Sequence, residues 1–205
     1  FDGKKTRRLN LSEISQIAGR AGRHVNDGNF GITGQCENFS ADEIEKLEKH
    51  ELNKINLIYW RNFELNFQSL DGLINSLDKK PNDRFLRKIN DCEDEKVLKF
   101  LIKNDRDIKI KNSQDVIQIL WQCCQIPDFS KKAYGNHIEI VKKVFNFLTS
   151  KSQKVSNDYM KTQLKYLDRY DGNIDTLSNR ISNVRTWSYV ANKRNWVENS
   201  DYWVQ

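Results

Sequence analysis

Glycine is distributed unevenly along this chain, and the unevenness divides the chain into two parts. Six of the nine glycines fall within the first 34 residues, while the other 171 residues hold three. Glycine weakens helices and strands because its backbone loses the most freedom on folding. We expect a short α/β segment over residues 1–36, with one strand at NFGITGQ (29–35), and an all-helical region over residues 37–205. The predicted fold class is therefore mainly α.

Apolar residues recur at helical spacing through most of the second part, which predicts amphipathic helices. The first of them is expected at residues 40–50, because Ser40 and Glu43 form a capping box. Further helices are predicted at residues 69–78, 83–90, 93–104, 114–126, 137–150, 157–170 and 174–191. In the fifth of these eight helices, the apolar stripe predicts that Leu120 and Trp121 are buried.

Composition describes a globular protein without a membrane or export signal. Apolar residues make up 38% of the chain, which is enough to build a core. No run of 18 apolar residues occurs, and the first residues lack the apolar segment of a signal peptide, so a cytoplasmic protein is expected. The formal net charge of +6 is compatible with nucleic-acid binding without establishing it.

The residues that most often bind metals show no metal-site spacing, so no metal site is predicted. No C-x-x-C pair occurs, and we expect buried free thiols at Cys36, Cys92, Cys123 and Cys124. The histidines are expected at solvated helix ends: His24, His50 and His137. Three aspartates lie close together in the sequence: Asp168, Asp171 and Asp175. We interpret the DGN within this stretch as a turn that starts a helix rather than as a metal loop.

The glycine-rich part contains one helix-like stretch, SEISQIAGRAGRH. Asn10 and Glu13 form a capping box, so a helix is predicted from about Leu11 to Arg23. At about 100° per residue, one face of this helix is apolar. That face gathers Leu11, Ile14, Ala18 and Ala21. The opposite face is polar and strongly basic.

The polar face carries Gln16, Arg20 and Arg23, with glycines at two neighbouring positions. Each of Gly19 and Gly22 costs about 1 kcal/mol relative to alanine inside a helix. That cost makes sense where another backbone or a phosphate must come close. Two arginines one turn apart can bind the oxygens of one polyphosphate with both guanidiniums. The alternative is a surface helix whose arginines are only solvated.

The phrase QIAGRAGR matches Q-x-x-G-R-x-G-R, the sixth motif of superfamily two helicases. More of the chain resembles the mitochondrial degradosome RNA helicase family, in its alphaproteobacterial form. The similar phrases are YWRNFELNFQSLDGLINSL, ILWQCCQIPDF, YLDRYDGNIDTLSNRISNVRTWSYVANKRNW and DYWVQ. The resemblance spans most of the chain, and it implies a bacterial cytoplasmic protein that takes part in RNA degradation.

By this resemblance, residues 1–36 are the end of the second RecA-like domain, and residues 37–205 are a helical accessory region. Arg20 and Arg23 would be arginine fingers, and Gln16 would orient them or the attacking water. Together with Gly19 and Gly22 they would face ATP bound with Mg²⁺. Expected partners are the remainder of the helicase core, RNA with DNA left open, and a ribonuclease where one exists.

The chain contains neither a phosphate loop nor a DExH box, which a helicase needs to hold and hydrolyse ATP. We therefore expect a C-terminal fragment of a longer enzyme that is inactive alone. The rival hypothesis is a non-catalytic module, either RNA-binding or protein-interacting, that keeps a helicase remnant.

A second candidate for nucleic-acid contact lies near the C-terminus, where basic and aromatic residues alternate. Such a composition suits single-stranded RNA. The residues concerned are Arg185, Lys193, Arg194 and Trp196, with Trp187 and Tyr189 among them. The simpler interpretation is a packed helix end, preceded by a buried apolar stripe. That stripe would consist of Ile174, Leu177, Ile181 and Val184.

Overall fold

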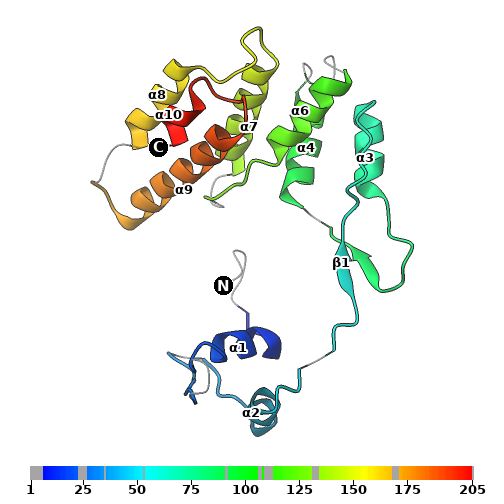
Figure 1. The fold of residues 1–205 in the computed structure, drawn as a ribbon, viewed down its shortest axis with the longest axis vertical. Helices are drawn as coiled ribbons and strands as arrows, with labels where there is room; N and C mark the ends of the chain where they lie inside the picture. The colour runs from blue at the N-terminus through cyan, green and yellow to red at the C-terminus, as the bar shows by residue number, and fades with distance from the viewer. Residues whose placement is uncertain are drawn as a thin grey trace. The chain divides into compact units, whose positions relative to one another are not determined.

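The computed structural model describes residues 7–22, 27–34, 36–52, 54–90, 92–105, 108, 113–130, 134–167 and 171–204. The fold is mainly helical, as predicted, and it includes a small two-stranded sheet (Figure 1). The chain forms two compact units, residues 1–58 and residues 59–205. The division between residues 36 and 37 rests on the resemblance and remains a prediction, whereas the compact units divide after Ile58.

The first unit contains two short helices, α1 (Leu11–Ala18) and α2 (Ala41–Glu48), which contact each other. Both predicted capping boxes are confirmed. The Asn10 side chain accepts a hydrogen bond from the Glu13 backbone N–H at 2.9 Å, and the Glu13 carboxylate accepts one from the Asn10 N–H at 2.9 Å. Ser40 and Glu43 are paired in the same way at α2. Each helix therefore begins where its capping residue predicts.

The strand predicted at residues 29–35 is wrong over the described residues 29–34, which are irregular. A strand needs a neighbouring backbone to pair with. Phe30 of this segment instead packs against the ring of Phe39. The rings of Phe30 and Phe39 lie 6.0 Å apart between centroids. The apolar residues of the segment thus serve local packing.

The second unit holds most of the helices. In chain order the elements from residue 58 onward are β1 (Ile58–Trp60), α3 (Leu70–Asp78), β2 (Leu86–Lys88), α4 (Glu93–Asn104), α6 (Gln114–Cys124), α7 (Tyr134–Leu148), α8 (Asn157–Leu167), α9 (Ile174–Asn192) and α10 (Ser200–Val204). Six of the eight helices predicted after residue 36 occur in this unit, close to their expected bounds. Three further elements, β1, β2 and α10, were not predicted from the sequence.

The helix predicted at residues 83–90 is wrong, because this segment forms a turn followed by β2. The Asp83 carboxylate accepts a hydrogen bond from the Phe85 N–H at 2.8 Å, which fixes the turn. The Ile89 N–H then donates to the Trp60 carbonyl at 2.9 Å. A pairing partner more than 20 residues away therefore overrides the local helical pattern.

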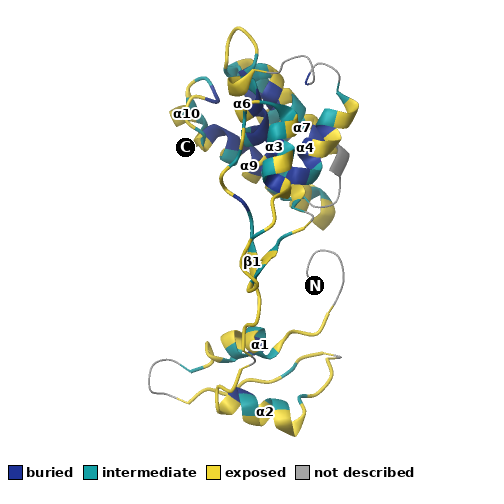
Figure 2. Cartoon of the chain, turned by 90° about the vertical axis from the view of Figure 1, so that its right-hand side faces the viewer, coloured by how far each residue is buried: buried dark blue, intermediate teal, exposed yellow. Residues whose placement is uncertain are grey.

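The core of the second unit lies among α4, α6 and α7, and Figure 2 shows buried residues gathered within its helices. Leu120 and Trp121 are 1% and 5% exposed, which confirms their predicted burial. The far end of α9 adds Trp187, Val190 and Ala191 to the core. Within the described residues, no helix has both the length and the apolar character needed to span a membrane.

The first half of α9 contradicts the predicted buried stripe. Ile174 is 86% exposed, Ile181 62% and Val184 44%, and Leu177 is only partly buried. The packing contacts of α9 instead involve its second half, which is buried from Thr186 onward. The helical spacing is therefore correct, but described residues leave most of this stripe uncovered.

Candidate functional site

The QIAGRAGR segment begins on α1 and continues into a tight turn. Gln16 is exposed on α1, which ends at Ala18 rather than at the predicted Arg23. The Arg20 N–H donates to the Ile17 carbonyl at 3.1 Å, so the turn after the helix is tighter than an α-helix. Arg20 is exposed on this turn, and Arg23 lies outside the described residues.

The two described arginines that precede this segment are both paired with carboxylates. Arg7 binds the Glu13 carboxylate through two hydrogen bonds of 2.6 and 2.8 Å. Arg8 forms ion pairs with Glu43 at 2.7 Å and with Glu37 at 3.1 Å. Among the described residues, no carboxylate forms an ion pair with Arg20. Its guanidinium is thus a cation available to an anionic group.

Gly28 allows two backbone segments of the first unit to approach each other closely. A Cβ atom built on Gly28 would overlap the backbone of Ala21 and Gly22. A Cβ on Gly19 would lie 3.3 Å from the Ser15 carbonyl, which is a tight contact. Another backbone segment thus comes close to this stretch at Ala21 and Gly22, whereas the atom near Gly19 belongs to α1 itself.

A cavity of about 540 Å³ lies beside α1 in the first unit. Its walls are mostly apolar and include Ile14, Ile17, Phe30 and Phe39. Neither Gln16 nor Arg20 lines it. An apolar cavity does not suit a triphosphate, so the nucleotide-facing surface expected from the motif is the exposed turn and not this cavity.

The Arg7–Glu13 pair yields a prediction about acidity. The hydrogen bonds from Arg7, and next the one from the Asn10 backbone, lower the pKa of Glu13 from 4.5 to about 2. We expect an NMR titration of the Glu13 carboxyl carbon to show this midpoint, and Arg7→Gln to raise it toward 4.5. Because the folded pKa is depressed, this stabilisation of α1 is complete above pH 4.5 and disappears as the pH falls through 2.

Arg20→Gln is the matched control, since Arg20 forms no ion pair with a described carboxylate. It should leave the Glu13 midpoint unchanged. A Glu13 midpoint near 4.5 in the unmodified chain would contradict the ion pair in solution.

The basic and aromatic residues of the second candidate are divided between surface and core. Trp196 is 8% exposed and belongs to the core, so its ring is not offered to a base. Arg185 is exposed, and its guanidinium lies 4.3 Å from the centroid of the Phe129 ring. Lys193 lies over Tyr189 at 4.9 Å, and Arg194 is exposed. The cations remain candidates for phosphate contact, while the tryptophan has a structural role.

No group of three His, Cys, Asp or Glu residues in the described part of the chain is placed to hold a metal ion. Cys123 and Cys124 are buried free thiols, as predicted, and burial raises the pKa of both. The prediction of burial is wrong for Cys36, which is exposed, and Cys92 is half-buried. Asn173 caps α9 through the Thr176 N–H at 2.9 Å, so the predicted DGN turn does start a helix, while Asp168 lies outside the described residues.

The two described histidines, His50 and His137, differ in solvent exposure. His50 is exposed just after α2, as expected, and His24 lies outside the described residues. His137 contradicts the prediction of a solvated helix end, because it is 5% exposed on α7. Burial lowers the pKa of His137, although the nearby Asp128 and Glu93 carboxylates act in the opposite direction. A neutral imidazole is therefore favoured there.

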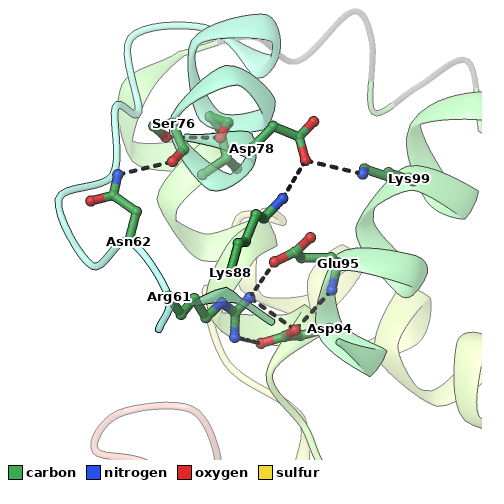
Figure 3. A network of polar contacts seen from close by, with 9 residues as sticks. Arg61, Asn62, Ser76, Asp78, Lys88, Asp94, Glu95 and Lys99 are labelled. Atoms are coloured by element: carbon green, nitrogen blue, oxygen red, sulfur yellow. Dashed lines mark hydrogen bonds and ion pairs between the residues drawn. The ribbon is translucent and has the colours of Figure 1, made fainter. Parts of the chain in front are cut away.

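A polar network at the start of the second unit was missed by sequence reasoning. Arg61 donates two hydrogen bonds to the Asp94 carboxylate, at 2.8 and 3.0 Å, and lies 3.4 Å from a Glu95 oxygen (Figure 3). Its guanidinium also lies 5.2 Å from the centroid of the Trp121 ring. Nearby, Lys88 donates to Asp78 at 2.8 Å. The only available signal was the run of acidic residues at the start of α4.

Comparisons with models of protein families, with curated proteins and with solved structures found no match to the chain.

Proposed function

We propose that this chain is the C-terminal part of an ATP-dependent RNA helicase that couples ATP hydrolysis to nucleic-acid unwinding in the bacterial cytoplasm. The observation that carries the proposal is the exposure of Gln16 and Arg20 within QIAGRAGR. Arg20 forms no ion pair with a described carboxylate, although Arg7 and Arg8 of the same unit are both paired. An arginine that no described carboxylate neutralises suits the phosphates of a bound nucleotide.

In this proposal Arg20 and Arg23 stabilise the negative charge that develops on the transferring phosphoryl group. Gln16 orients them or the attacking water, and Gly19 and Gly22 belong to the same nucleotide-facing surface. ATP with Mg²⁺ would be held mainly by a phosphate loop and a DExH box that this sequence lacks. The 205-residue chain alone is therefore expected to have no ATPase activity.

A specific observation favours the alternative, a non-catalytic module that binds RNA or another protein. The first half of α9 leaves Ile174 and Ile181 largely exposed, as an interaction surface would. The two proposals predict different gene sequences upstream of the codon for Phe1. A reading frame that continues into a phosphate loop and a DExH box supports the helicase, and a start codon close to Phe1 supports the module.

RNA contact by the exposed cations can be tested separately from catalysis. Arg194→Ala is expected to weaken binding of a single-stranded RNA and to lower the slope of log affinity against log salt by about 0.7, the value for one lost phosphate contact. The measurement is fluorescence anisotropy at several salt concentrations. ATP hydrolysis per bound complex in the parent enzyme should stay nearly unchanged.

Arg84→Ala removes an equally exposed arginine that lies over Phe85, between α3 and β2. It should leave both the affinity and the salt slope unchanged. Equal slopes in the Arg194→Ala variant and the unmodified chain would remove Arg194 from the RNA-contacting surface.

A further inference from the structure

A small polar cavity lies between α7, α9 and the turn at residues 128–130. Its volume is about 160 Å³. Its walls are built almost entirely from hydrogen-bonding side chains, among them Asn136, His137, Asn179, Asn183 and Thr186. Pockets that hold whole small molecules usually measure roughly 300 to 1000 Å³, so this smaller space suits one ring of a larger ligand.

Several of these side chains have unused hydrogen-bonding capacity. Within the described residues, the side chains of Asn136, His137, Asn179 and Asn183 form no hydrogen bond. Asn136 and Asn179 are exposed, Asn183 is half-buried, and His137 is 5% exposed. Three amides and one imidazole thus line one small space with donors and acceptors that are not used by described residues and are accessible to a ligand.

The polar groups of the wall define what can enter the cavity. Asp128 is the one carboxylate among the described wall residues, and it accepts hydrogen bonds from the Ser130 N–H and hydroxyl at 3.0 and 2.7 Å. The other described polar groups of the wall are amides, hydroxyls and one imidazole. A neutral group with both donors and acceptors on its edge fits best, because each amide offers both.

A positive charge lies next to the residues of the cavity wall. Arg185 is exposed and lies over Phe129, the residue between Asp128 and Ser130 in the cavity wall. The Ser182 hydroxyl donates to the Phe129 carbonyl at 3.2 Å, which ties this turn to α9. A cation without a described ion pair therefore lies next to a cavity lined by amides and hydroxyls, an arrangement that suits one nucleotide of a single strand.

We propose that this cavity binds a single nucleobase, of pyrimidine size, from a single-stranded RNA whose backbone phosphate contacts Arg185. The inference rests on the proposed function, because it takes RNA as the substrate. Amides read the Watson–Crick edge of an unstacked base, and the cavity volume favours a one-ring base over a purine. The site would hold the strand without taking part in ATP hydrolysis.

The test uses the 205-residue chain and fluorescein-labelled ten-nucleotide RNAs, rU10 and rA10, without ATP. The double substitution Asn179→Ala/Asn183→Ala is expected to weaken rU10 binding at least tenfold. Asn192→Ala, at the other end of α9 where the amide bonds the Ser188 carbonyl, should stay within twofold. The unmodified chain should prefer rU10 over rA10, and the double variant should lose that preference.

A second measurement needs no variant. NMR spectra of the unmodified chain should show that rU10 shifts the side-chain amide signals of Asn179 and Asn183 and the ring signals of His137. Unchanged affinity in the double variant, equal affinity for both RNAs, or binding without these shifts would each overturn the proposal. Since ATP is absent, such a failure is distinguishable from failure of the helicase proposal, which depends on ATP turnover in the parent enzyme.

Discussion

Arg23→Lys in the intact enzyme is expected to lower ATP turnover at saturating RNA by about a thousandfold, the scale of a lost arginine finger. Lysine keeps the charge but loses the planar fork that contacts two oxygens at once. Because the lost contact is made with charge that develops only in the transition state, affinity for RNA should change little. Steady-state ATP turnover and RNA anisotropy, measured on the same preparation, test both expectations.

Arg20→Lys should act in the same direction, since the structure places Arg20 on an exposed turn beside Gln16. Arg8→Lys is the matched control in the same unit, because a lysine can keep the ion pair with Glu43. It should retain turnover. Full turnover in Arg23→Lys would show that the arginine-finger assignment is wrong, and the non-catalytic module would become the better hypothesis.

Sequence reasoning succeeded where structure depends on residues close together along the chain. The capping boxes Asn10–Glu13 and Ser40–Glu43 each involve residues three positions apart, and both form as predicted. Burial of Trp121 followed from the spacing of apolar residues within a single helix. These features need no knowledge of the rest of the fold.

The failures share a different cause, which is dependence on distant partners. Residues 86–88 form a strand because Trp60 lies alongside, and residues 29–34 do not form one despite a suitable pattern. Ile174 and Ile181 have helical apolar spacing, yet no described element covers them. Periodicity shows which face of a helix is apolar, but whether anything packs on that face depends on the tertiary structure.

The same division applies to the candidate sites. QIAGRAGR is a continuous motif, so Gln16 and Arg20 could be singled out from the sequence. The polar cavity combines residues near 128–137 with residues near 179–186, and its members look like ordinary surface residues when read in order. They come together only in the folded chain, where residues of α7 and α9 line the same cavity.

Arg61→Ala is expected to lower the free energy of unfolding by about 3 kcal/mol. This value is at the low end for breaking a buried ion pair, because the Arg61 side chain is 27% exposed. The Asp94 and Glu95 side chains are only 17% and 6% exposed, and both would lose their counter-charge. Trp121 would also lose its contact with the guanidinium. Urea unfolding followed by circular dichroism measures the change in the free energy of unfolding.

The structure also predicts which second substitution restores stability. Glu95 has an oxygen that accepts no hydrogen bond from a described residue, so its buried charge depends on Arg61. Adding Glu95→Gln to Arg61→Ala removes that charge and should recover part of the loss. Arg87→Ala, an exposed arginine on β2, should change the free energy of unfolding by less than about 0.5 kcal/mol. An Arg61→Ala variant as stable as Arg87→Ala would mean that the network in Figure 3 contributes nothing to the fold.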